Sequence, residues 1–100
     1  MWNLIDIPLF LINANIIAKE YGYLIGLYGS VLYSGSSNHD LDLMAFKYVD
    51  NPNKDAFINN FITYFNGYLV DSYDGLFAYG YVIEIIINEE SHLIDLSIRK

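Results

Sequence analysis

Apolar residues in the first twenty positions recur at the spacing of a helix. They are Leu9, Ile12, Ile16 and Ile17. Side chains three to four residues apart lie on one face of a helix, which we expect to pack against a core. Asp6-Ile7-Pro8 places a proline in the first turn, where its missing N–H costs no hydrogen bond. Because Tyr21-Gly22 supplies a C-cap glycine, the pattern predicts that the helix ends there.

A second helix is predicted by phenylalanines that repeat every four residues. The apolar positions are Phe57, Ile58, Phe61, Ile62 and Phe65. Asn51-Pro52 has the form of an N-cap followed by a proline at the first helical position. Asn66-Gly67 ends the stripe. We expect this phenylalanine stripe to be core and not a cofactor site.

Strand patterns fill most of the remaining chain. Residues 23–28 and about 40–48 form two runs rich in apolar residues, and 68–73 form a short third run. Two further β-rich runs follow, at 76–87 and 92–98. The order is therefore helix, two strands, helix and about three strands, which predicts an α+β domain of two layers. We expect a mixed sheet with the helices packed on one face.

The last two strands read as a hairpin joined by Asn88-Glu89-Glu90-Ser91. If Glu89 and Glu90 are the centre of the turn, paired residue numbers sum to 179, and Glu84 lies opposite Asp95. Alternation then gives one apolar face, which we expect against the helices. That face carries Ile83, Ile85, Ile87, Ile94, Leu96 and Ile98. Two acids close together on the other face are unusual for a purely structural sheet.

Composition and charge limit the class of protein. With 100 residues, 54% of them hydrophobic, we expect one folded domain over residues 1–100. The absence of cysteine excludes disulfides and thiolate metal sites. The net charge is −7, and the five cations are scattered: Lys19, Lys47, Lys54, Arg99 and Lys100. A nucleic-acid substrate is disfavoured because such proteins carry a basic footprint, and a nucleotide or protein substrate is preferred.

The N-terminal segment predicts neither secretion nor membrane insertion. It lacks the basic start of a signal peptide. The most apolar window, Leu4 to Ala18, contains Asp6, Asn13 and Asn15, and it is shorter than the ~20 residues that a membrane span needs. We therefore expect a soluble, cytoplasmic protein.

Candidate chemistry is concentrated between residues 29 and 43. Gly29-Ser30 follows the first strand, and a turn of small residues can bring backbone N–H groups close to a phosphate. Asp40 and Asp42 are two residues apart, so a strand would point both carboxylates the same way. Two like charges side by side cost free energy unless a cation or a proton lies between them. The segment predicts phosphate contacts followed by metal-binding carboxylates.

This combination resembles the nucleotidyltransferase superfamily, which includes the DNA polymerase beta type enzymes and the minimal nucleotidyltransferases. The resemblance rests on Gly29-Ser30, nine intervening residues, Asp40-Leu41-Asp42 and a later strand with Ile94-Asp95-Leu96. It covers essentially the whole chain and implies a single minimal nucleotidyltransferase-like domain.

The resemblance also implies a mechanism. Asp40, Asp42 and Asp95 would be the catalytic and metal-binding acids, holding two Mg²⁺ (or Mn²⁺) ions, with Asp95 as a general base. Gly29 and Ser30 would bind the β and γ phosphates of a nucleoside triphosphate such as ATP. A hydroxyl of a protein or small molecule would attack the α-phosphate and release pyrophosphate. Some family members modify a partner toxin as an antitoxin, and the acidic charge suits a basic partner.

Two departures from the family pattern are compatible with a partner subunit, with a vestigial enzyme or with very broad acceptor use. Leu32-Tyr33-Ser34 precede Gly35, so this loop brings no cation to the phosphates. The chain ends five residues after Asp95, which leads us to expect no further domain for base and acceptor recognition. The alternative is a catalytically inactive, nucleotidyltransferase-like binding module that acts through protein–protein contacts. A small phage-like protein would fit either function.

Each candidate residue also has a structural interpretation. Asp40, Asp42 and Asp95 could be solvated strand acids, and Glu84 is more often a surface acid than a site residue. We expect His39 to orient the loop and His92 to be exposed beside the turn. Seven tyrosines cannot all be buried with their hydroxyls satisfied, which predicts a homodimer or partner surface. They are Tyr21, Tyr23, Tyr28, Tyr33, Tyr73, Tyr79 and Tyr81.

Overall fold

Two helices and seven strands make up the regular structure of the described residues. The computed structural model describes residues 2–3, 6–27, 36–37, 41–87 and 89–100. The helices are α1 (Ile7–Glu20) and α3 (Lys54–Tyr64). The strands are β1 (Trp2–Asn3), β2 (Tyr23–Leu27), β3 (Ser36–Ser37), β4 (Leu41–Lys47), β5 (Tyr68–Asp74), β6 (Ala78–Ile87) and β7 (Glu90–Arg99). The expected α+β class is confirmed.

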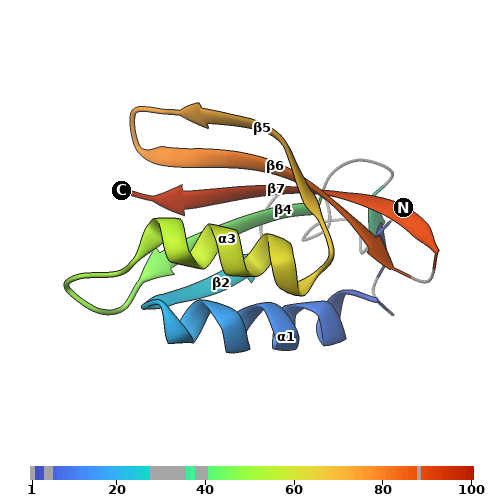
Figure 1. Ribbon diagram of the computed structural model, residues 1–100, viewed down its shortest axis with the longest axis horizontal. Coiled ribbons are helices and arrows are strands. Elements are labelled where there is room, and N and C mark those ends of the chain that lie inside the picture. The colour runs from blue at the N-terminus through green and yellow to red at the C-terminus, as the bar shows by residue number, and fades with distance from the viewer. Residues whose placement is uncertain (1, 4–5, 28–35, 38–40, 88) are drawn as a thin grey trace.

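Five strands form one mixed sheet in the order β2-β4-β7-β6-β5. Neighbouring strands are antiparallel except β4 and β7, which are parallel. Both helices lie on the same face of the sheet, as Figure 1 shows. The two layers are therefore a sheet and a pair of helices, and β1 and β3 form a separate two-stranded ribbon.

The core lies between these layers. Buried side chains of β4 and β7, such as Leu43 and Leu96, meet phenylalanines of both helices. The ring of Phe10 on α1 lies edge-on to that of Phe61 on α3, with 6.2 Å between ring centroids. On the sheet side, Tyr23 stacks on Phe57 at 5.1 Å. Aromatic residues thus join the two helices to each other and to the sheet.

Helix α1 has the predicted ends but buries a different face. Gly22 follows the helix with φ of +94°, a conformation that glycine adopts without strain. The helix buries Ile7, Phe10, Ala14, Ile17 and Ala18. Of the predicted stripe only Ile17 is buried, whereas Leu9, Ile12 and Ile16 are 66%, 60% and 57% exposed. The prediction was wrong for these three residues because α1 carries apolar side chains on two faces, and spacing alone did not show which one meets the sheet.

Helix α3 buries the predicted stripe but begins later than expected. Phe57 and Phe61 are fully buried, and Phe65 is partly buried against them. The N-cap is Asn53, whose side chain accepts a hydrogen bond from the Ala56 N–H at 3.2 Å. Asn51 and Pro52 therefore precede the helix and do not begin it. Asn53 is a second asparagine two residues after Asn51, and both are residues that commonly cap helices.

The β6–β7 hairpin has the predicted faces but a different register. Ile83 and Ile94 are opposite each other, so paired residue numbers sum to 177 and not 179. The connection is shorter than expected, because Ile87 already pairs with Glu90. Asp95 therefore lies opposite Val82, and Glu84 lies opposite Leu93. A shift of two residues preserves which side chains share a face. His92, expected to be exposed, is 5% exposed within β7.

Candidate functional site

Asp42 and Asp95 are nearest neighbours across two central strands. Strand β4 carries Asp42 and strand β7 carries Asp95, and the two residues are partners in the parallel register. Adjacent strands are about 4.8 Å apart, which brings the two carboxylates side by side. The two residues are 53 positions apart in the sequence, so only the fold brings them together.

Both acids lie on the sheet face opposite α1 and α3, which we call the outer face. Their strand neighbours Leu41, Leu43, Ile94 and Leu96 are fully buried in the core. Because side chains alternate along a strand, Asp42 and Asp95 point away from the helices. Both are half-buried. The outer face therefore presents two partly exposed aspartates, although Oδ1 of Asp95 is itself buried.

The charges on the outer face make this pair unusual. Two carboxylates on adjacent strands repel each other, and a divalent cation or a shared proton relieves the repulsion. Hard cations such as Mg²⁺ prefer oxygen ligands, and paired carboxylates suit them. Paired carboxylates of this kind supply two oxygen ligands of the type that such a cation prefers.

Glu84 lies on the same face but diagonal to Asp95 and not opposite it. In the observed register its partner on β7 is Leu93, while on β5 it pairs with Tyr68. A hydrogen bond with Glu84 raises the pKa of the Tyr68 hydroxyl, and the charge of Glu84 adds to the effect. Glu84 thus forms a hydrogen bond with Tyr68 of the edge strand β5.

Several predicted site residues lie outside the described residues. They are Gly29, Ser30, His39 and Asp40. The structure consequently brings together two of the three predicted acids and leaves the third and the phosphate-binding turn as predictions. Within the described part of the chain, no group of three or more histidine, aspartate or glutamate side chains could hold a metal ion.

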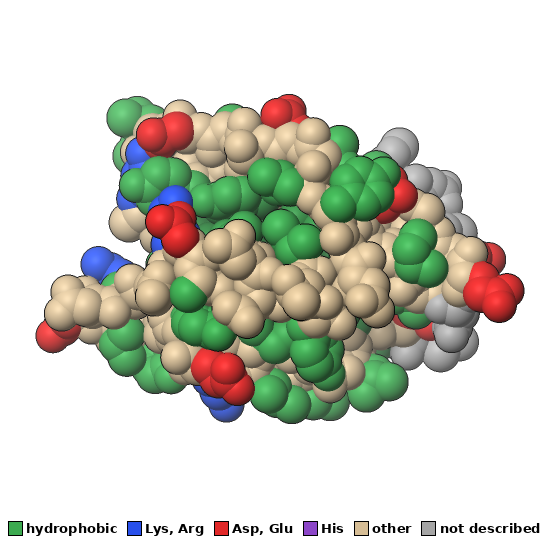
Figure 2. Space-filling model, in the orientation of Figure 1, with side chains coloured by type: hydrophobic (Ala, Val, Ile, Leu, Met, Phe, Trp, Pro, Cys, Tyr) green, Lys and Arg blue, Asp and Glu red, His purple; other side chains and the backbone are tan. Residues whose placement is uncertain are grey.

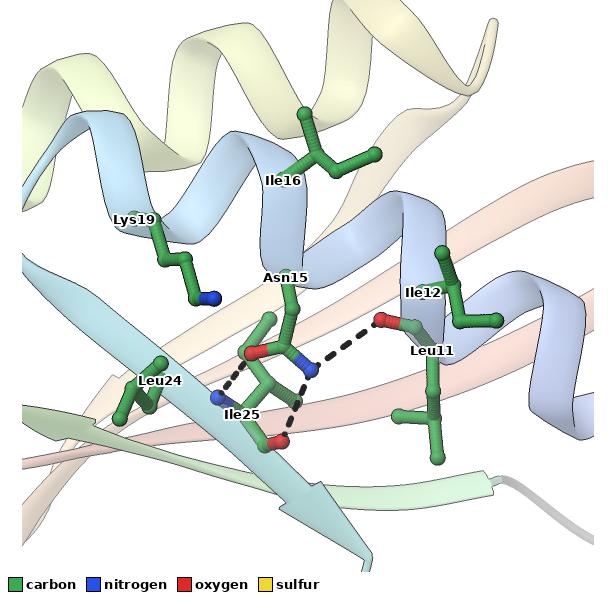
Figure 3. A pocket seen from close by; sticks show the side chains of 7 residues that line it. All are labelled: Leu11, Ile12, Asn15, Ile16, Lys19, Leu24 and Ile25. Carbon is green, nitrogen blue, oxygen red and sulfur yellow. Dashed lines mark hydrogen bonds between the residues drawn. The ribbon is translucent and has the colours of Figure 1, made fainter.

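A groove between α1 and β2 is lined by Leu11, Ile12, Asn15, Ile16, Lys19, Leu24 and Ile25. Figure 3 shows the Asn15 amide pointing from α1 to the backbone of Ile25. Asn15 Oδ1 accepts the Ile25 N–H at 2.7 Å, and Nδ2 donates to the carbonyls of Ile25 and Leu11, each at 3.1 Å. The amide therefore occupies the edge of β2 in place of a further strand. This polar group of the groove has a structural role.

The tyrosines form less of a common surface than the sequence predicts. Tyr23 is buried, and Tyr21, Tyr79 and Tyr81 pack partly buried against the core. Tyr73 is 50% exposed. Tyr28 and Tyr33 lie outside the described residues. Two of these partly buried tyrosines contact Lys54. Its ammonium lies 4.2 Å from the ring centroid of Tyr79 and donates a hydrogen bond to the Tyr81 hydroxyl at 3.0 Å.

The sequence patterns did not predict the parallel pairing that aligns the two acids. A signal was present, because Leu41-Asp42-Leu43 and Ile94-Asp95-Leu96 are both an aspartate between two large apolar residues. Such a triplet places its acid on one face and its apolar residues on the other. Two strands that both bury their apolar residues in one core place their acids on the same face of the sheet. The triplets do not show that the two strands are neighbours.

Comparisons with known proteins do not identify a family. The chain matches no protein-family model, and no curated protein matches its sequence. Within the described residues, no helix is long and apolar enough to cross a membrane.

Proposed function

We propose that the protein is a Mg²⁺-dependent nucleotidyltransferase that moves a nucleoside monophosphate from a nucleoside triphosphate to a hydroxyl of a protein or small molecule. The observation that carries this proposal is the in-register pairing of Asp42 with Asp95 on the outer face. Asp40, two residues before Asp42, would be the third acid. Mg²⁺ or Mn²⁺ would be the cofactor.

The fold agrees with the resemblance at the coarse level. A helix, a strand followed by Gly29-Ser30, a strand with Asp42 and a later strand with Asp95 occur in the expected order. The helices lie on one face of a mixed sheet and the acids on the other. This supports a nucleotidyltransferase-like fold.

The proposed chemistry assigns a role to each acid. Bound divalent cations would stabilise charge on the attacking and leaving oxygens of an in-line displacement. Asp40, Asp42 and Asp95 would hold the divalent cations that bind the phosphates of the nucleotide. Asp95 would orient the acceptor hydroxyl and take its proton as the new O–P bond forms. The bond from the α-phosphorus to the bridging oxygen breaks, and pyrophosphate leaves with that electron pair.

A transfer assay tests the proposal. The protein is incubated with Mg²⁺ or Mn²⁺ and each α-³²P-labelled nucleoside triphosphate, alone and with candidate acceptors, and Asp42→Ala is run in parallel. We expect labelled product from the wild type and none from Asp42→Ala. Asp71→Ala is the matched control, because Asp71 is an exposed acid at the edge strand β5. Equal labelling by wild type and Asp42→Ala would overturn the assignment of the site.

A second candidate, a catalytically inactive module acting through protein contacts, is favoured by the exposed apolar face of α1. Figure 2 shows hydrophobic side chains gathered along this helix. Leu9 and Ile16 lie symmetrically about the middle of the exposed stripe, so two antiparallel copies of α1 would bring Leu9 of one against Ile16 of the other. Analytical ultracentrifugation of the wild type and Ile16→Asp distinguishes this candidate. A wild-type dimer that Ile16→Asp converts to a monomer supports it, and a wild-type monomer at all concentrations rejects self-association.

A further inference from the structure

The ring of Tyr73 lies flat against the sheet over Gly80. Tyr73 on β5 is directly opposite Gly80 on β6. A Cβ atom added to Gly80 would lie 1.9 to 2.3 Å from three carbon atoms of the Tyr73 ring. The ring therefore occupies the space that a side chain at position 80 would take. Since Tyr73 is 50% exposed, part of the ring remains open to solvent.

Strand register places this ring on the outer face. Gly80 pairs with Ser97 on β7, two residues after Asp95. Residues two apart on a strand share a face, so the ring and the Asp95 carboxylate lie on the same side of the sheet. Two residues along the strand and one strand across amount to about 8 Å between the Cα atoms of Gly80 and Asp95. This is comparable with the span of a nucleotide from phosphate to base.

Beyond the ring, the outer face continues across β7, β4 and β2. Ser97 is next to Gly80 and is 5% exposed, and Met44 on β4 follows it. Gly26 on β2 pairs with Met44 in turn. A Cβ added to Gly26 would meet nothing within 4 Å, in contrast to Gly80. Beyond the ring, the outer face therefore carries the small residues Ser97 and Gly26, with Met44 between them.

We propose that Tyr73 is the base-stacking residue of the nucleotide site, with the base on its exposed ring face and the metal-bound phosphates at Asp42 and Asp95. This inference rests on the proposed nucleotide-binding function. Stacking on one aromatic ring accepts every base, because each base has a π face. The ligand class is therefore a nucleoside triphosphate with little preference among bases.

A ring over a glycine also has a purely structural use, since aromatic side chains stabilise strand glycines by covering them. Tyr73→Leu separates the two roles, because leucine can cover Gly80 but offers no π face. Tyr73→Phe keeps the ring and removes only the hydroxyl. Gly80→Ala keeps Tyr73 but displaces its ring, and its backbone is compatible with alanine because Gly80 does not have a positive φ.

The test measures Mn²⁺-dependent binding of ATP and of inorganic tripolyphosphate by isothermal titration calorimetry. Tripolyphosphate carries the phosphates without a base. We expect the wild type and Tyr73→Phe to bind ATP more tightly than tripolyphosphate, and Tyr73→Leu and Gly80→Ala to lose about 5- to 100-fold in ATP affinity only. Tyr64→Leu is the matched control, because Tyr64 is 57% exposed, similar to Tyr73, but lies on α3. Unfolding curves establish that each variant is folded.

The outcomes separate the two proposals. If Asp42→Asn abolishes binding of both ligands while Tyr73→Leu binds ATP as the wild type does, the phosphate site stands and the stacking role of Tyr73 is overturned. If the wild type binds neither ligand with Mn²⁺, the nucleotide function fails, and the stacking role fails with it.

Discussion

Asn15 and Ile25 are joined by two hydrogen bonds that replace a neighbouring strand at the edge of the sheet. The Ile25 N–H donates to Asn15 Oδ1 at 2.7 Å, and Asn15 Nδ2 donates to the Ile25 carbonyl at 3.1 Å. An open strand edge can pair with another chain, and native proteins cover such edges. The sequence shows only an asparagine in an apolar helix, whereas the structure gives it a defined role.

Replacing Asn15 with alanine is expected to destabilise the protein by about 1–3 kcal/mol, because the partly buried backbone groups of Ile25 lose their partners. Chemical denaturation measures the change. The control is Asn60→Ala, since the Asn60 side chain donates to a carbonyl of its own helix, that of Ala56, at an exposed position. Its expected effect is within about 0.5 kcal/mol. Equal effects of the two substitutions would contradict the role of Asn15.

Two adjacent isoleucines on α1 are expected to differ strongly. Ile17 is 7% exposed and belongs to the core, whereas Ile16 is 57% exposed. Ile17→Ala leaves a cavity and should cost about 2–5 kcal/mol of unfolding free energy. Ile16→Ala should change it by about 0.5 kcal/mol or less in the monomer. Urea denaturation of both variants at low protein concentration checks which face of α1 is buried. A larger loss of unfolding free energy for Ile16→Ala than for Ile17→Ala would contradict the orientation of the helix.

Stability is expected to fall at alkaline pH in part because of Tyr23. Burial raises the pKa of its hydroxyl above the ordinary value of 10.0, although the nearby Lys54 opposes the shift. The unfolded chain therefore releases this proton first as the pH rises. The stability that the neutral phenol contributes is complete below pH 10 and is lost as the pH rises through the higher folded pKa.

Tyr23→Phe tests this pH dependence, since phenylalanine retains the stacking on Phe57 but cannot ionise. Free energies of unfolding are measured between pH 8 and 11.5 by chemical denaturation. We expect the variant to lose less stability than the wild type above pH 10. The substitution leaves the hydrogen bond between Lys54 and Tyr81 in place. That bond raises the pKa of the Lys54 ammonium in both proteins, so its effect on stability is common to them. Identical slopes for the two proteins would show that Tyr23 does not contribute.

Much of the fold could be predicted because local patterns were consistent with the final structure. The phenylalanine stripe of α3 and the alternation in the last hairpin each had one apolar face, so the core side was unambiguous. Helix α1 has apolar residues on two faces, and the choice between them depends on the sheet. The hairpin register depended on the turn, where Glu89 has a positive φ of 68° that its sequence did not indicate.

The candidate site was less predictable than the fold. Alternation could place Asp95 on the face away from the helices, and the structure agrees. Its neighbour could not be deduced, because pairing between β4 and β7 joins segments 53 residues apart. The Tyr73 ring over Gly80 was also missed, since a tyrosine opposite a glycine is recognised only once the register is known.

Binding of Mn²⁺ at the Asp42–Asp95 pair is the central claim, and thermal unfolding with and without the ion tests it most directly. A ligand that binds only the folded state stabilises it by an amount that grows with concentration over Kd, about 2.7 kcal/mol at 100 times Kd. We expect Mn²⁺ to raise the Tm of the wild type and of the control Asp71→Asn, but not that of Asp42→Asn or Asp95→Asn. An equal rise in all four proteins, or none in the wild type, would contradict a metal site at this pair.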